Sequence, residues 1–327
     1  MNDDLIEYLQ RLQACHYSAS RITQMRYAVE LLISYVREQH QVSDWREVTA
    51  EHIYQFAGWL GTRYRKSYGG TENSLVSLST IRQWLSCVRV FLHWQVTEQR
   101  LMQNPIAQMR LPRPQSTQVR ALSEAEMSRL IETPDISKKL GIRDRAILEL
   151  LYATGLRLRE VCRLDLYDVE LTDEQITVRG GKGGSDRVLP LTEQACHWLQ
   201  RYISEVRGEL ALGQLPTKRR RQALMKPPPT LSPALWLTVY GRRLAWQTLL
   251  QLIRQYGAEI KVKATVHTFR HSFATHLLKR GAAIEDIKRL LGHRNLDITQ
   301  IYTHLETADL QQVIKKAALP HDKEPLD

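Results

Sequence analysis

The sequence predicts a mainly α-helical protein with a small β-sheet, divided into two domains. Apolar residues recur at helical spacing along most of the chain, whereas residues 175–191 alternate in the manner of two strands. A proline-rich stretch after residue 104 interrupts the helical pattern. A chain of 327 residues is long enough for two domains with separate cores.

The first hundred residues read as helices only, because four apolar stripes follow one another. The residues that we expect to face the core are Leu5, Ile6, Leu9 and Leu12; Ile22, Val29, Leu32, Ile33 and Val36; Ile53, Phe56, Trp59 and Leu60; and Ile81, Leu85, Val88 and Leu92. Thr49 can cap the third helix, and the fourth starts near Ser79. Polar groups that could contact phosphates, or simply form a solvated outer face, are Arg21, Arg26, Arg63, Arg65, Lys66, Arg82, Gln83 and Arg89.

Residues 105–121 cannot continue a helix, since they contain three prolines and several basic residues. We therefore expect a helical N-terminal domain over residues 1–104, a linker over 105–121 and a second domain over 122–327. Ser123 and Glu126 have capping-box spacing and open the second domain with a helix.

A broken helix follows in residues 141–164. The pattern predicts a helix that ends at Gly155, a turn, and a second helix that starts at Arg157. Backbone N–H groups at such a start favour an anion.

Residues 175–191 predict a β-hairpin with Lys182 at its glycine-rich tip. An ordinary flexible Gly-Lys loop is the plainer interpretation. A nucleotide-binding P-loop is excluded, because its spacing is absent. This region is completed by a helix from about Thr192, a strand at residues 234–239 and a helix from about Leu244. The insertion at residues 213–233 is basic and proline-rich. It is either an extra DNA contact or a solvated loop.

The C-terminal region concentrates ionisable side chains at regular spacing. His267 and Arg270 are three residues apart in an amphipathic pattern, so they share one helix face. That helix should end near Gly281, and the next should stop at Gly292, which leaves His293 just beyond a helix end. Asp297 can cap a last short helix that carries Tyr302.

Composition favours a polyanionic partner, with nucleic acid the leading candidate. The chain has 46 Lys and Arg against 35 Asp and Glu, a net charge of +11. No apolar run approaches the length of a membrane span, and the acidic start is unlike a signal peptide, so we expect a cytoplasmic protein. The widely separated cysteines indicate reduced, partly buried thiols rather than a zinc or disulfide framework: Cys15, Cys87, Cys162 and Cys196.

One ordered set of motifs runs through the second domain: Ala-Thr-Gly-Leu-Arg, a hairpin lysine, His-x-x-Arg, Leu-Gly-His and then a tyrosine. This set resembles the tyrosine recombinase (phage integrase) family. The length of the chain and its small helical first domain look Xer-like. The family positions map onto Arg157, Lys182, His267, Arg270, His293 and Tyr302. The resemblance implies an N-terminal helical, SAM-like, core-type DNA-binding domain before an α+β catalytic domain. Arg159 stands where the family often has serine, while Glu160 is kept.

The resemblance implies cutting and rejoining of DNA. Tyr302 would attack a phosphodiester and form a 3′-phosphotyrosyl link. Two arginines can hold the non-bridging oxygens, the histidines can hydrogen-bond or assist proton transfer, and the lysine can protonate the leaving 5′ oxygen. We therefore expect no metal, no cofactor and no need for ATP.

The implied partners are double-stranded recombination sites and further protomers that form a tetramer on two sites, with a second recombinase or accessory protein possible. Two alternatives stay open: DNA relaxation of the type IB topoisomerase kind, and a DNA-binding regulator without catalysis. The residues do not distinguish integration, excision or resolution, or name the DNA sequence.

Overall fold

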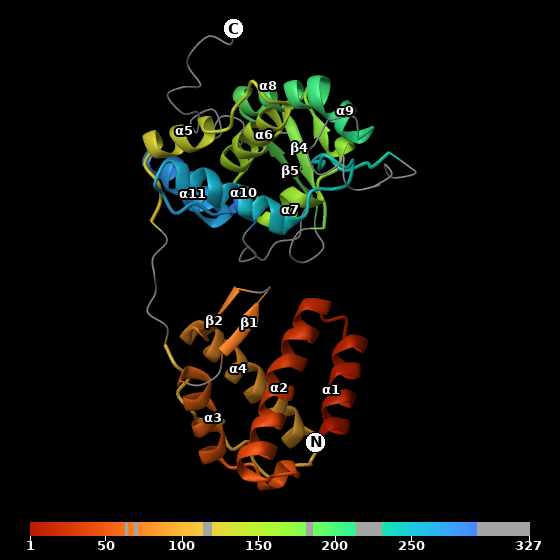
Figure 1. Cartoon of the computed structure of the whole chain (residues 1–327), viewed down its shortest axis with the longest axis vertical. Helices are drawn as coiled ribbons and strands as arrows, with labels where there is room; N and C mark the ends of the chain where they lie inside the picture. The colour runs from red at the N-terminus through yellow and green to blue at the C-terminus, as the bar shows by residue number, and fades with distance from the viewer. Residues whose placement is uncertain (63–64, 69–70, 114–119, 181–185, 214–230, 293–327) are drawn as a thin grey trace. The chain divides into compact units, whose positions relative to one another are not determined.

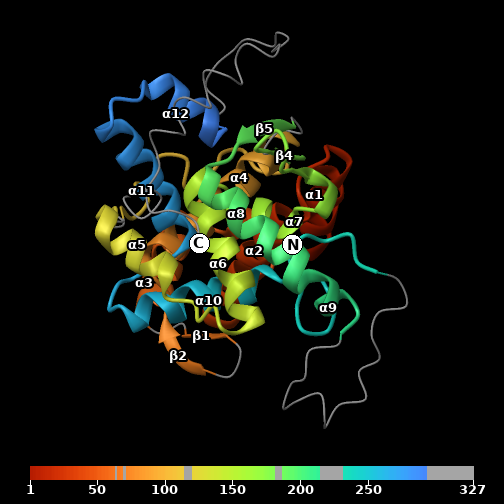
Figure 2. The same cartoon turned by 90° about the horizontal axis from the view of Figure 1, so that it is seen from above.

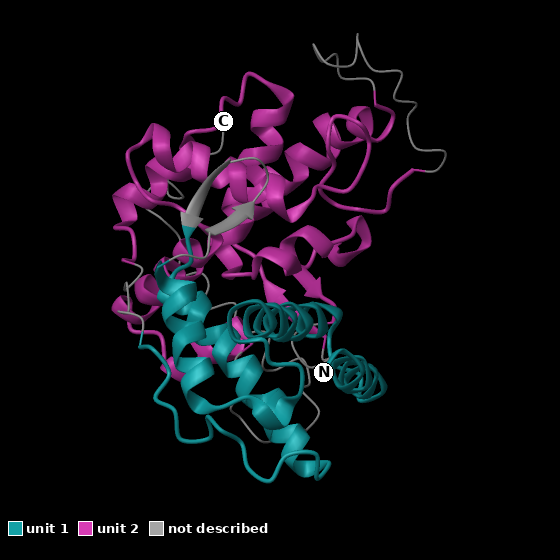
Figure 3. Cartoon of the chain, turned by 60° about the horizontal axis from the view of Figure 1, so that its bottom comes forward, with its two compact units in different colours: residues 1–117 teal, residues 118–327 magenta. Residues whose placement is uncertain are grey.

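The computed structural model describes residues 1–62, 65–68, 71–113, 120–180, 186–213 and 231–292, and only the backbone of 65–68 and 71–74. The chain divides into two compact units, residues 1–117 and 118–327 (Figure 3). Each unit has its own buried apolar cluster. The division falls within the segment 105–121, whose first residues pack on the first unit: Ile106 and Met109 are buried in its core.

The first unit is a helical bundle with a hairpin (Figure 1). Its elements are α1 (Asn2–Ala14), α2 (Ala19–His40), η1 (Trp45–Glu47), α3 (Ala50–Thr62), β1 (Arg65–Tyr68), β2 (Thr71–Leu75) and α4 (Leu78–Thr97). Side-chain caps fix where the helices begin: Ser18 caps α2, Thr49 accepts from the backbone N–H of His52 at the start of α3, and Ser77 caps α4. The buried faces of α2 and α4 pack on each other.

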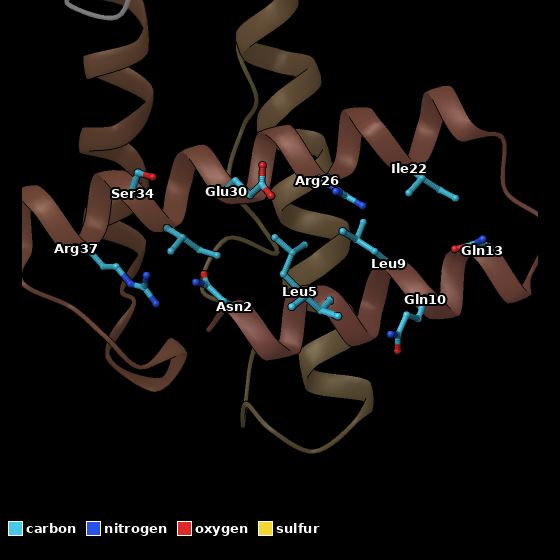
Figure 4. A pocket seen from close by; sticks show the side chains of 12 residues that line it. Asn2, Leu5, Leu9, Gln10, Gln13, Ile22, Arg26, Glu30, Ser34 and Arg37 are labelled. Carbon is cyan, nitrogen blue, oxygen red and sulfur yellow. The ribbon is translucent and has the colours of Figure 1, made fainter.

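Two details of the first unit were predicted wrongly. The first hundred residues are not helices only, because β1 and β2 form an antiparallel pair. Ile6 is 54% exposed instead of buried, and Tyr8 takes the core position on α1. Ile6 lines a groove of about 740 Å³ between α1 and α2, together with Leu5, Leu9 and Ile22 (Figure 4).

The second unit places helices around a small sheet. Its elements are α5 (Glu124–Glu132), α6 (Lys139–Thr154), α7 (Leu158–Arg163), η2 (Leu166–Asp168), β3 (Val169–Glu170), β4 (Gln175–Val178), β5 (Arg187–Pro190), α8 (Glu193–Arg201), η3 (Tyr202–Arg207), α9 (Gly208–Ala211), α10 (Trp246–Glu259), α11 (Val266–Lys279) and α12 (Ile284–Leu291). The strands are antiparallel in the order β3-β4-β5. The predicted hairpin and the mainly α fold class are thus confirmed.

Helix α6 is the centre of this unit. Its residues 141–154 are all buried, and it packs against α8, η3 and α11 (Figures 1 and 2). It ends at Gly155 in the left-handed conformation, as predicted. Among the described helices, none combines the length and the apolar character needed to cross a membrane.

The predicted strand at residues 234–239 is wrong. This buried segment makes only isolated bridges, from Ala234 to Asp165 and from Leu237 to Arg243. Side chains bind two of its carbonyls and that of the preceding Ser232: Arg207 donates to the carbonyls of Ser232 and Ala234, and the Tyr202 hydroxyl donates to that of Leu235. Both side chains belong to η3, a π-helix that continues α8. The helix predicted from Thr192 therefore changes from α to π geometry at the residues that bind this segment.

Candidate active site

Helix α11 carries two of the predicted site residues. Thr265 and Thr268 cap its start reciprocally, with Thr265 Oγ1 accepting from the Thr268 N–H at 3.2 Å. Phe269 and Phe273 are buried in the core and fix the rotation of the helix. His267 is exposed and Arg270 is partly buried, and their spacing puts both on one face.

The Arg270 guanidinium bridges the ends of two helices. Its Nη1 donates to the Gly155 carbonyl at 2.9 Å, and its Nη2 donates to the Leu291 carbonyl at 2.7 Å. Gly155 closes α6 and Leu291 is the last residue of α12. Carbonyls at helix C-termini lack partners within the helix and carry the negative end of the helix dipole, so a guanidinium suits them.

Arg157 reaches the same place from α7. It is the N-cap residue of that helix, as predicted, and its Nη2 donates to the Gly292 carbonyl at 3.2 Å. Its Nη1 also donates to Glu160 Oε1 at 3.0 Å. Arg157 and Arg270, far apart in the sequence, therefore converge on two consecutive carbonyls at the end of α12.

Sequence reasoning missed a third cation, Arg187, the first residue of β5. Its two Nη atoms contact the two oxygens of Glu160 at 3.1 and 2.9 Å, a bidentate ion pair. The Arg187 side chain also packs against Gly292. An arginine in the same hairpin as Lys182 was the available signal, but its pairing with Glu160 is visible only in three dimensions.

The charges of this cluster favour an anion. Burial opposes a charge on Glu160, but hydrogen bonds from Arg187 and from the Arg157 backbone N–H outweigh it and lower the pKa of Glu160. Burial, together with the nearby charges of Arg157 and Arg187, lowers the pKa of Arg270 to about 10, so Arg270 remains protonated at neutral pH. The described part of the cluster thus contains three positively charged guanidinium groups, those of Arg157, Arg187 and Arg270, and one carboxylate, that of Glu160.

Three of the predicted site residues, Lys182, His293 and Tyr302, lie outside the described residues, as does Asp297. The described part of the site is therefore Arg157, His267 and Arg270, to which the structure adds Glu160 and Arg187. Gly292, the last described residue, directly precedes His293 in the chain.

The first unit holds a second basic cluster, which we call the arginine pocket. Arg82, Arg89, Arg110 and Arg113 line it with Leu111, and its volume is about 640 Å³. Arg82 Nη1 donates to the Pro112 carbonyl at 3.2 Å, and Arg89 donates to the carbonyl of Met109. Because these partners are neutral carbonyls, they do not offset the positive charges of Arg82 and Arg89.

The chain has relatives among known proteins. The phage integrase family matches residues 120–309. Tyrosine recombinase XerD of Staphylococcus haemolyticus is 36% identical over 239 residues, 72% of this chain and 75% of the relative. Tyrosine recombinase XerD of Pseudomonas aeruginosa is 34% identical over 282 residues, 82% of this chain and 89% of the relative.

Solved structures share the fold. The Tn1549 transposon integrase in complex with circular intermediate DNA superposes with a TM-score of 0.65 at 15% identity, covering 94% of this chain and 98% of that one. A lambda integrase tetramer bound to a Holliday junction gives 0.63 at 14% identity, covering 92% and 80%. Given these matches, the chain belongs to the phage integrase family and is a tyrosine recombinase, an enzyme of site-specific DNA recombination.

Proposed function

We propose that this enzyme is a Xer-like recombinase that cuts each strand through a 3′-phosphotyrosyl link to Tyr302. The convergence of Arg157 and Arg270 at the end of α12 is the observation that carries the proposal. Guanidinium groups held in fixed orientations with surplus positive charge stabilise the extra negative charge of a pentacoordinate phosphate. The Arg157 side chain is 31% exposed, so a phosphate can approach it.

The proposed step balances without a cofactor. The Tyr302 phenol passes its proton to one of the site histidines as its oxygen attacks phosphorus, the bond to the 5′ oxygen breaks, and Lys182 gives that oxygen a proton. His267 and His293 hydrogen-bond the non-bridging oxygens or assist proton transfer. Attack by a 5′ hydroxyl of another strand reverses the step and releases the tyrosine, so the link conserves the bond energy and no ATP is needed.

The proposed substrate is a double-stranded recombination site held by both units. Residues 1–104 would act as a core-type DNA-binding domain and residues 122–327 as the catalytic domain. The arginine pocket supports the first role, since DNA phosphates are anions that such a cluster binds.

Strand exchange needs two sites and four active sites, so we propose a tetramer on two duplexes. The lambda integrase structure is a tetramer bound to a Holliday junction. A second recombinase or an accessory protein would be an additional partner of this assembly. The DNA substrate puts the activity in the cytoplasm.

Covalent trapping tests the proposal. On a nicked duplex whose leaving fragment diffuses away, the wild-type protein should become attached to the 3′ phosphate. Tyr302→Phe should bind the same DNA without forming the adduct, whereas the control Tyr54→Phe, an exposed tyrosine of the first unit, should form it. Peptide mapping of the DNA to another residue would overturn the assignment of Tyr302.

Substitution of the arginines tests the charge argument. Arg157→Ala and Arg270→Ala should each slow adduct formation by about 10²–10³, the usual cost of one lost donor to a transition-state anion. Excess EDTA should leave cleavage intact. Cleavage that EDTA abolishes and Mg²⁺ restores would refute the metal-independent mechanism.

A further inference from the structure

The chain enters the second unit along α11, and three contacts hold it there. The Leu122 N–H donates to Ser272 Oγ at 2.9 Å, and the Leu122 carbonyl lies 2.8 Å from His276 Nε2. Arg280 pairs with Glu124, with Nη2 and Oε2 at 2.9 Å. Ser272 and His276 on α11 and Arg280, the residue directly after it, are four residues apart and form one stripe. We call residues 122–124 the strap.

The contact with Leu122 determines which ring nitrogen of His276 carries a hydrogen. A carbonyl only accepts, so His276 Nε2 carries the hydrogen that goes to Leu122. Nδ1 lies 2.9 Å from the Tyr152 hydroxyl of α6 and, in the neutral ring, accepts from it. Burial lowers the pKa of His276, in keeping with a neutral ring. One imidazole, 2% exposed, thereby joins the strap, α11 and α6.

The elements that His276 joins are those that hold Arg270. Arg270 projects from α11 and donates to the carbonyl of Gly155, which closes α6. The strap and α5 lie beside α11 (Figures 1 and 2). Residues 270 and 276 are about 9 Å apart along a rigid helix, so a shift of α11 at His276 moves Arg270 as well.

We propose that His276, with Ser272, is a positioning residue for DNA cleavage: it locks the strap and α6 onto α11 and thereby sets Arg270 against the scissile phosphate. The proposal rests on the role given to Arg270 in the proposed function. The histidine touches no substrate. It acts through the placement of α11 relative to the end of α6.

The test compares three variants by single-turnover cleavage of the nicked duplex. His276→Leu removes the donor to Leu122 and the acceptor for Tyr152, whereas His276→Gln keeps an amide that can donate to Leu122. Because a misplacement of about 1 Å can cost about 100-fold, we expect His276→Leu to cleave about 10- to 100-fold more slowly with unchanged DNA affinity. His276→Gln should recover most of the rate, and the control Leu278→Ala, on the exposed side of α11, should match the wild type.

Hydrogen exchange supplies a readout that does not depend on catalysis. Ser272→Ala leaves the helix intact but removes the acceptor of the Leu122 N–H, so that amide should exchange faster while cleavage slows. This variant also decides the question if His276→Leu does not fold.

The inference fails if Ser272→Ala and His276→Leu cleave at the wild-type rate, or if cleavage and DNA affinity fall together and His276→Gln restores neither. Absence of a 3′ adduct in the wild type would instead refute the proposed function.

Discussion

Gly155 ends α6, and its carbonyl accepts a hydrogen bond from Arg270. A methyl group added at Gly155 should therefore disturb both the fold and the active site. The φ of +58° at Gly155 would cost a residue with a side chain roughly 1–2 kcal/mol. An added Cβ would also lie 2.8 Å from Leu291 Cδ2 and 2.8 Å from Phe273 Cδ1. Overpacking of this kind typically costs about 1–3 kcal/mol. We therefore expect Gly155→Ala to lower the free energy of unfolding by about 2–5 kcal/mol.

Two other glycines separate these contributions. Gly180 has φ of +60°, but none of the described residues has an atom within 4 Å of an added Cβ, so Gly180→Ala should lose only about 1–2 kcal/mol. Gly208, in α9, has neither constraint, and alanine there should be neutral or stabilise by up to about 1 kcal/mol. Urea unfolding of the whole chain, with hydrogen exchange of α6 and α11 to report on the second unit, measures all three. A Gly155→Ala loss no larger than that of Gly180→Ala would refute the packing argument.

Further predictions concern buried polar groups. Gln95 is fully buried and its amide has no hydrogen-bond partner within the described residues, so Gln95→Leu should raise the free energy of unfolding by about 1–3 kcal/mol in urea; a loss would mean that the amide is satisfied. The Tyr256 hydroxyl donates to the buried Asp144 at 2.9 Å, and Tyr256→Phe should cost about 1–3 kcal/mol, with Tyr54→Phe neutral as its control. Burial, aided by Arg280 and Lys279 and opposed by Glu124 and the Leu122 carbonyl, lowers the pKa of His276 below its ordinary 6.5. The unfolded chain then binds the proton more readily than the folded chain. The stability that neutral His276 contributes is therefore fully present above pH 6.5 and is lost as the pH falls below 6.5. Between about pH 7.5 and about pH 5 the wild type should lose more stability than His276→Gln, and equal losses would contradict this.

Local signals explain what the sequence predicted well. Gly155 and Gly292 end their helices in left-handed conformations that glycine adopts without penalty, and Ser123 and Glu126 form the expected capping box. The strand alternation of residues 175–190 likewise identified β4 and β5. Each of these signals lies within a few residues of the feature that it predicts.

The remaining features depend on contacts between distant segments. Arg187 binds Glu160 across two elements, and a Gly-Gly pair was the only local hint of the β1–β2 hairpin. Segment 234–239 looked like a strand because its residues are mostly apolar, but side chains of η3 bind the carbonyls of Ala234 and Leu235. Arg270 donates to the backbone carbonyls of Gly155 and Leu291, which no sequence pattern displays. The roles of Lys182, His293 and Tyr302 stay predictions.

Backbone anchoring has a consequence for how this site tolerates change over evolution. The carbonyls that hold Arg157 and Arg270 belong to Gly292, Gly155 and Leu291, and a carbonyl is present whatever side chain its residue bears. Point substitutions elsewhere in α6 and α12 can therefore accumulate without removing an acceptor. A single-residue insertion or deletion is different, because it turns the end of a helix by about 100° and carries the terminal carbonyl away from the guanidinium. Relatives of this enzyme should thus keep the lengths of these helices even where their side chains differ.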